Sequence, residues 1–267
     1  PALKAMSAAA DCVADAIGPR SGLRGDPPLA YSVNLTRCPM LQAVRQSVPL
    51  AIGVVVIAAP LLTIALVLAT SATRHVSSMF IIGWAAGIMT VLGVIVAFVD
   101  TTVPSRGIAP HALAVIRIGI GAILVLLAIR TAKAAVRSWH RRRAGGAVTP
   151  PAMIRNLAGW SARRSFITGL SLSAVNPKNV APTAAGAAAI LEASQAPLEQ
   201  AFAIIVFTFI ASLGIAIPAV LSALGGQRVN SALVRASGWM TRHAETVSAV
   251  VLTVLGIVLL VKGIGGG

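Results

Sequence analysis

The sequence predicts an all-α polytopic membrane protein whose six transmembrane helices form two inverted three-helix repeats. The chain has 267 residues, of which 57% are hydrophobic and only 11% are charged, whereas soluble domains carry about 25% charged residues. Six apolar runs are long enough to cross a hydrocarbon core of about 30 Å, which takes roughly 20 helical residues. Uninterrupted runs of this length do not fit the alternating pattern of a membrane barrel, so we expect helices.

The six runs consist mainly of Ala, Val, Leu, Ile and Gly. They cover residues 47–70, 78–99, 112–134, 165–190, 201–224 and 243–264. The first three define a repeat over 40–134, and the last three define a second repeat over 165–267. The fourth run is interrupted by Asn176-Pro177-Lys178-Asn179, which predicts either one broken helix or a re-entrant pair.

The two halves are predicted to be inverted because each contains an odd number of crossings. The first run of each half carries a central proline, Pro60 and Pro177, roughly 18–20 Å deep at 1.5 Å per residue. The third runs also resemble each other around Gly121 and Gly256. Lipid cannot satisfy the backbone groups that a proline frees, so matched breaks point to a substrate path. The alternative is that each proline only kinks its helix.

Basic residues predict the orientation. The segment 135–164 contains seven arginines and no acid, so we expect it to be a cytoplasmic loop. By alternation, Arg74 and the loop carrying Arg235 lie on the same side, and both termini lie outside. The net charge of +15 is explained by these segments. We expect no nucleic-acid partner, because no basic aromatic stretch suited to stacking bases is present.

Residues 1–39 differ from the rest of the chain. They contain charged residues of both signs and no apolar core long enough for a signal peptide. Met40 lies just before Leu41-Gln42-Ala43-Val44-Arg45 and the first apolar run, where a native chain would start. We therefore expect 1–39 to be a disordered tail or an upstream extension of the native protein. Both cysteines, Cys12 and Cys38, fall in this segment, without C-x-x-C spacing.

The polar break in the fourth run predicts the substrate path. An ionisable side chain near the centre of a span costs at least about 2.5–3.5 kcal/mol, so it usually faces a cavity or a partner. Asn176, Pro177, Lys178 and Asn179 would form a polar pocket, with Pro60 at the matching break. Lys178 would bind an anionic headgroup, or it would pair with Asp100 or a helix C-terminus. The alternative is a structural lysine that extends toward the interface.

Three further residues are candidates for coupling or gating. Asp100 ends the second run and Arg117 lies in the first turns of the third; they could pair across the outer mouth or be solvated helix ends. His243, which can titrate near neutrality, opens the last run after Thr241 as its expected N-cap. Glu245 would then complement the helix dipole in the first turn.

The sequence contains no Walker A, GxSxG, HExxH or calcium-loop motif. The membrane part has four acids, Asp100, Glu192, Glu199 and Glu245, which are too few and too scattered for hydrolysis or a cation cage. We therefore expect no enzyme activity, no metal site and no cofactor. Transport against a gradient would need an ion gradient or a partner ATPase. Elsewhere, Gly169-x-x-x-Ser173 predicts close helix packing.

The run 164–179 resembles the Asn-Pro-Lys-Asn segment of the GAP family, the glycopeptidolipid- and sulfolipid-addressing proteins of the lysine-exporter (LysE) superfamily. Further similarities are Gly83-Trp84, the segment 206–218 and Gly238-Trp-Met-Thr-Arg-His243. The resemblance covers about 40–267. It implies a six-helix plasma-membrane protein that moves an envelope glycolipid or its precursor across the inner membrane, with Asn176, Pro177, Lys178 and Asn179 at the substrate path.

Two other functions remain open at this stage. One is an exporter of amino acids or other small solutes, which would use the same helix breaks around a smaller pocket. The other is an accessory scaffold whose basic 135–164 loop docks an envelope-lipid synthase, a larger exporter or anionic membrane lipids.

Overall fold

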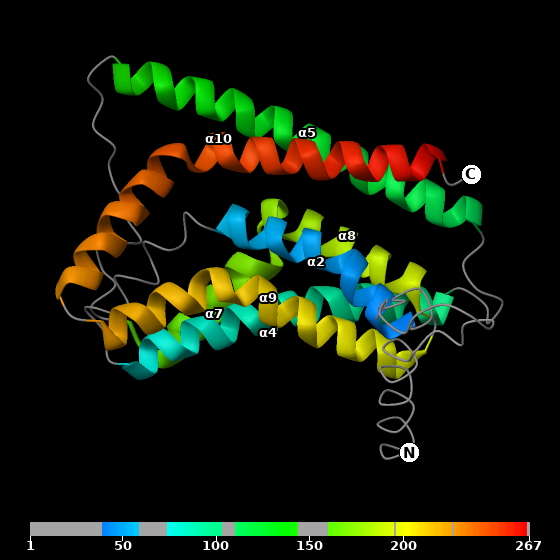
Figure 1. Ribbon diagram of the computed structural model, residues 1–267, viewed down its shortest axis with the longest axis horizontal. Coiled ribbons are helices and arrows are strands. Elements are labelled where there is room, and N and C mark those ends of the chain that lie inside the picture. Colours follow the sequence, from blue (N-terminus) through cyan, green and yellow to red (C-terminus); the bar gives the residue numbers. More distant parts are fainter. Residues whose placement is uncertain are drawn as a thin grey trace, which may run out of the picture.

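The computed structural model describes residues 39–58, 74–102, 110–143, 160–194, 196–225 and 227–265. Within these ranges every regular element is a helix, as the sequence predicts, and most helices run along one common axis (Figure 1). The helices are α2 (Pro39–Ala58), α4 (Arg74–Thr102), α5 (Pro110–Arg143), α7 (Ala162–Ala174), α8 (Pro177–Ala193), α9 (Pro197–Leu224) and α10 (Gln227–Gly265). Pro60 and the predicted tail, apart from Pro39, lie outside the described residues.

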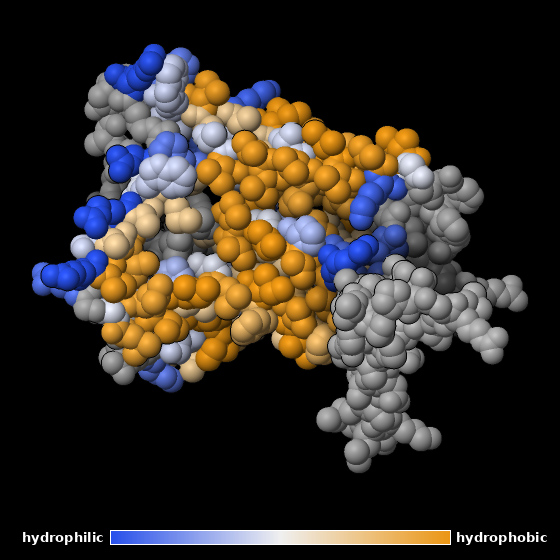
Figure 2. All heavy atoms as spheres, viewed as in Figure 1, coloured by the Kyte–Doolittle hydropathy of each residue, from blue (hydrophilic) through white to orange (hydrophobic). Residues whose placement is uncertain are grey.

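The outer surface of the bundle is apolar along its middle. Figure 2 shows a broad hydrophobic surface with hydrophilic residues gathered toward the ends. Large side chains such as Phe98 and Phe209 are about two-thirds exposed (66% and 65%), an arrangement that water would penalise and hydrocarbon does not. Five of the described helices, α2, α4, α5, α9 and α10, are long and apolar enough to cross a membrane. The chain is therefore a membrane protein.

The fourth apolar run is divided into two helices. α7 has 13 residues and α8 has 17, which correspond to about 20 and 26 Å at 1.5 Å per residue. Each is shorter than a hydrocarbon core of about 30 Å. In Figure 1, α8 continues in the direction in which α7 runs. The predicted interruption is confirmed, and its course is that of a broken helix and not of a pair that turns back.

The helices pack in two groups. α4 packs against α7, and α2 packs against both α8 and α9. The buried core of this group includes Phe80, Trp84 and Ile88 of α4 and Phe207 of α9. α5 packs mainly against α10, and this pair forms a separate layer over the other helices (Figure 1).

Small residues bring the backbones of α4 and α7 into contact. A Cβ atom added at Gly169 would collide with the carbonyl oxygen of Phe80, and one at Gly83 would collide with that of Phe166. Gly87 faces Ser173 in the same way. The close packing predicted at Gly169 and Ser173 is confirmed, and its partner is the Gly83-x-x-x-Gly87 pair of α4, a spacing typical of tight membrane helix contacts.

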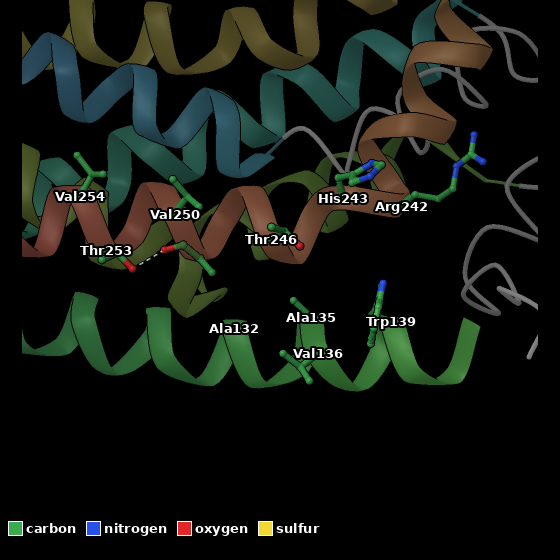
Figure 3. Close-up of a pocket in the computed structure, with 11 residues that line it drawn as sticks. Ala132, Ala135, Val136, Trp139, Arg242, His243, Thr246, Val250, Thr253 and Val254 are labelled. Carbon is green, nitrogen blue, oxygen red and sulfur yellow. Dashed lines mark hydrogen bonds between the residues drawn. The ribbon is translucent and has the colours of Figure 1, made fainter. Parts of the chain in front are cut away.

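α10 begins well before the last apolar run. It starts at Gln227, so the prediction of Thr241 as its N-cap is wrong. Thr241 lies inside the helix, where its hydroxyl donates to the carbonyl of Ser237 (2.7 Å). The helix bends before it joins the bundle (Figure 1), and Figure 3 places Arg242 and His243 at this bend. α5 likewise continues to Arg143, into the segment expected to be a loop.

Candidate functional site

The break between α7 and α8 is closed by its own residues. The side chain of Asn176 caps α8, because its Oδ1 accepts a hydrogen bond from the backbone N–H of Lys178 (3.1 Å). Pro177 is the first residue of the helix, where its missing N–H costs nothing. The N–H groups of Asn179 and Val180 both donate to the carbonyl of Asn176 (2.9 Å). The backbone N–H groups at the start of α8 therefore already have hydrogen-bond acceptors, so only side chains are available there to bind a ligand.

Asn179 ties the two half-helices together. Its side chain is 1% exposed, and its Nδ2 donates to the carbonyl of Leu172 (2.9 Å), one of the last carbonyls of α7. Such carbonyls have no partner within their own helix. The carbonyl of Asn179 in turn accepts from the Thr183 hydroxyl (2.7 Å). Asn179 therefore supplies part of the hydrogen bonding that the break removes.

A polar chamber lies beside the break, between α8, α2 and α10. Its volume is about 220 Å³, and its lining includes Asn176, Lys178 and Asn179 of α8 together with Glu245 and Ser248 of α10. The Oε2 atom of Glu245 and the Oδ1 atom of Asn179 are buried and have no hydrogen-bond partner among the described residues. Lys178 is partly buried. The structure thus brings a cation, a carboxylate and an amide to one cavity in an apolar bundle.

Glu245 is the site residue that sequence reasoning missed. From the sequence we expected Glu245 in the first turn of the last helix, where the helix dipole alone accounts for an acidic residue. It lies about five turns after Gln227 at 3.6 residues per turn, so the dipole of the N-terminus does not explain it. Its signal in the sequence was its position inside an apolar run with very few acids. A carboxylate there usually faces a partner or a cavity.

Of the other candidate residues, only His243 has a described side chain, and it does not line the chamber. His243 is exposed, its Nδ1 lies 3.0 Å from the carbonyl oxygen of Trp239, and its ring contacts the Trp239 ring at 4.7 Å between centroids. Asp100 and Arg117 belong to α4 and α5, but their side chains are outside the described part, as is Pro60. The predicted pairing of Asp100 with Arg117 or Lys178 stays a prediction.

We expect Asn179→Ala to lower the free energy of unfolding by about 1–2 kcal/mol, because it leaves the Leu172 carbonyl without its partner. The measurement is the unfolding midpoint of the purified protein in mild detergent, titrated with a denaturing detergent. Gln227→Ala removes an exposed amide from the start of α10 and serves as the control. Equal midpoints for the two variants would contradict the bridging role of Asn179.

Comparison with known proteins identifies a relationship for most of the chain. The family model described as "SfLAP: Sap, sulfolipid-1-addressing protein" matches residues 48–265. The match includes the helix break, the polar chamber and α10. No curated protein and no solved structure matches the chain.

Proposed function

Because the chain belongs to the Sap, sulfolipid-1-addressing protein, family, we propose that it is an inner-membrane transporter that exports or flips an envelope glycolipid or its precursor. The apolar helices of membrane-spanning length support a role within the bilayer. The observation that carries transport is the polar chamber, where Lys178 and Glu245 lie in an otherwise apolar bundle. Ionisable groups inside membrane bundles typically mark substrate or ion paths.

The proposal includes six crossings in two inverted halves, as in the lysine-exporter superfamily. α7 and α8 together would span about 48 Å at 1.5 Å per residue, enough for one crossing. The packing supports the symmetry: α2 of the first half packs against α9 of the second, α4 packs against α7, and α5 packs against α10. If the two halves exchange places, the pairing of α2 with α9 becomes the pairing of α7 with α4, and the pairing of α5 with α10 becomes itself. Inverted repeats place the substrate at their interface.

The proposal also orients the protein. Arg74 begins α4, Arg143 ends α5 and Arg228 lies in the first turn of α10, and these helix ends gather at one end of the bundle, on the left in Figure 1. We refer to it as the arginine end. The positive-inside rule assigns it to the cytoplasm. Both termini of the membrane part would then face the outside.

In this mechanism the chamber binds the headgroup. Lys178 attracts a phosphate, sulfate or carboxylate group, and Asn179 and Ser248 add hydrogen bonds to sugar or ester oxygens. Glu245 would pair with Lys178 when the site is empty and release it when the anion arrives, so that the lysine need not remain an unpaired charge inside the membrane.

A small-solute exporter is the second candidate, and the size of the chamber favours it. A volume of about 220 Å³ is below the roughly 300–1,000 Å³ of sites that enclose drug-sized ligands. An amino acid would bind with its carboxylate at Lys178 and its ammonium at Glu245. The same two residues would serve both functions, so only the transported molecule distinguishes them.

The deciding experiment compares surface-extractable and total cell lipids with and without the gene. We expect one glycolipid to disappear from the surface while it, or its precursor, accumulates inside, and the intact gene to restore it. Amino-acid efflux is measured in the same strains. Unchanged lipid pools with reduced efflux would replace lipid export by the small-solute function.

A further inference from the structure

A second polar pocket lies on the same three helices as the polar chamber, farther from the arginine end. Its volume is about 90 Å³, and its lining includes Gln46 of α2, Glu192 of α8 and Lys262 of α10. Glu192 and Lys262 belong to the last turns of their helices, and these helix ends lie opposite the arginine end (Figure 1). We refer to this space as the distal pocket.

The charged residues of the two spaces match, with the helices exchanged. In the chamber the lysine, Lys178, comes from α8 and the glutamate, Glu245, comes from α10. In the distal pocket Glu192 comes from α8 and Lys262 comes from α10. From Met40 onward the chain contains three lysines and four acidic residues, and two of each line these spaces. Ionisable groups inside membrane bundles typically mark a path, so the second set is explained in the same way as the first.

Each space also contains a carboxamide with the same requirement. The Oδ1 atom of Asn179, in the chamber, and the Oε1 atom of Gln46, in the distal pocket, are buried and have no hydrogen-bond partner among the described residues. An acceptor of this kind gains a hydrogen bond when a ligand brings an O–H or N–H group. Both spaces therefore suit a ligand that carries an anionic group beside hydrogen-bond donors.

A thin apolar barrier separates the two spaces. Along α2 their linings are separated by residues 51–56, and along α10 by residues 249–254. Either segment corresponds to about 10 Å at 1.5 Å per residue. Val54 and Leu252, which belong to these segments, are fully buried. The barrier is therefore much thinner than a hydrocarbon core of about 30 Å.

A leucine side chain closes the barrier against a glycine. A Cβ atom added at Gly53 of α2 would lie 2.7 Å from the Cδ1 atom of Leu255 of α10, so the leucine lies directly on the α2 backbone. Leu255 also lines the distal pocket. A side chain can change its rotamer without moving the backbone of its helix. The contact between Gly53 and Leu255 can therefore open by a local change.

We propose that the distal pocket is a second binding site for the anionic headgroup, on the exit side of the path, which the headgroup reaches from the chamber when Leu255 leaves Gly53. The proposal rests on the proposed transport function and adds the exit site to it. The pocket holds the charged group, a sulfate, phosphate or carboxylate, at Lys262, and the Gln46 oxygen accepts from a neighbouring hydroxyl or amine. With the arginine end in the cytoplasm, the distal pocket faces the outside.

The first test measures whether Lys262 attracts anions into the distal pocket. The full chain, with both of its cysteines replaced by serine, carries Ala189→Cys in the pocket lining and is placed in nanodiscs. Two thiol reagents are compared, the anionic sulfonatoethyl and the cationic trimethylammonioethyl methanethiosulfonate. We expect Lys262→Gln to lower the ratio of the anionic to the cationic rate about fivefold. Lys133→Gln, at an exposed position of α5, is the matched control and should leave the ratio unchanged.

The second test locks the barrier. Gly53→Cys combined with Leu255→Cys places two thiols at the contact between α2 and α10, where oxidation can join them. The oxidised pair should stop export, a reductant should restore it, and either single cysteine should export normally in the presence of the oxidant. Lys262→Gln should lower export about fivefold.

An unchanged ratio of rates in Lys262→Gln would overturn the distal site, and full export by the oxidised pair would overturn the route past Leu255. The two proposals can fail separately. A ratio that depends on Lys262, in a protein whose loss leaves the cellular lipid pools unchanged, would retain the anion site and remove lipid export. Altered lipid pools together with a ratio that does not depend on Lys262 would retain lipid export and remove the distal site.

Discussion

Replacing Lys178 by alanine is expected to lower export about tenfold to a hundredfold while the protein still inserts and folds. The substitution removes the cation of the polar chamber and leaves the carboxylate of Glu245 in the chamber without it. A hydrogen bond to a charged group is worth roughly 1.5–3 kcal/mol, which corresponds to this range of rates. The measurement is the surface-extractable fraction of the exported lipid, divided by the amount of protein in the membrane.

Two substitutions separate the role of this charge from a general effect on the helix. Lys178→Arg keeps the charge and should retain part of the export, whereas Lys133→Ala removes an exposed lysine of α5 and should retain all of it. Glu245→Gln combined with Lys178→Ala should cost less than the sum of the single effects, because each single variant leaves the other charge unpaired. Normal export by Lys178→Ala would remove the chamber from the substrate path.

Gly169→Leu is expected to prevent most of the protein from folding. The added side chain would collide with the backbone of α4, at the Phe80 carbonyl oxygen and the Trp84 nitrogen (2.9 Å), and a backbone cannot rotate out of the way. Overpacking a core costs about 1–3 kcal/mol even where side chains can adjust, so we expect a larger loss here. The measurement is the monodisperse fraction of the protein extracted into mild detergent.

Gly93→Leu is the matched control for this variant, because nothing lies within 4 Å of a Cβ added at that position of α4. It should yield as much folded protein as the unchanged chain. Equal yields for Gly169→Leu and Gly93→Leu would mean that α4 and α7 are not held together by contact between their backbones.

Local patterns predicted the elements of the fold. An apolar run long enough for a membrane has almost no choice but to form a helix, so the long helices follow from composition. The break at Pro177 follows because proline ends the hydrogen bonding of the preceding helix, and Asn176 is a natural cap. Gly169 and Ser173 predicted close packing because small side chains permit it.

Local patterns did not predict which residues form the site, because this depends on tertiary packing. Lys178 and Glu245 are far apart in the sequence, and their meeting depends on how α8 lies against α10. The early start of α10 was also hidden, because residues 227–242 are too polar for a span although they form a helix. That one error assigned Glu245 to a helix terminus. His243 was singled out for its titration range, but its side chain contacts Trp239 and not the chamber.

The helix α10 lies between the polar chamber and a cleft of about 780 Å³ that it forms with α5, and this position has a thermodynamic consequence. A displacement of this helix toward α5 would narrow the cleft and widen the chamber, so occupants of the two spaces compete for the position of a single helix. If a headgroup in the chamber favours one position of α10, it changes the affinity of the cleft for an apolar ligand by a fixed factor, and that ligand changes the affinity of the chamber for the headgroup by the same factor. The angle of the bend at Arg242 would then depend on which of the two spaces is occupied.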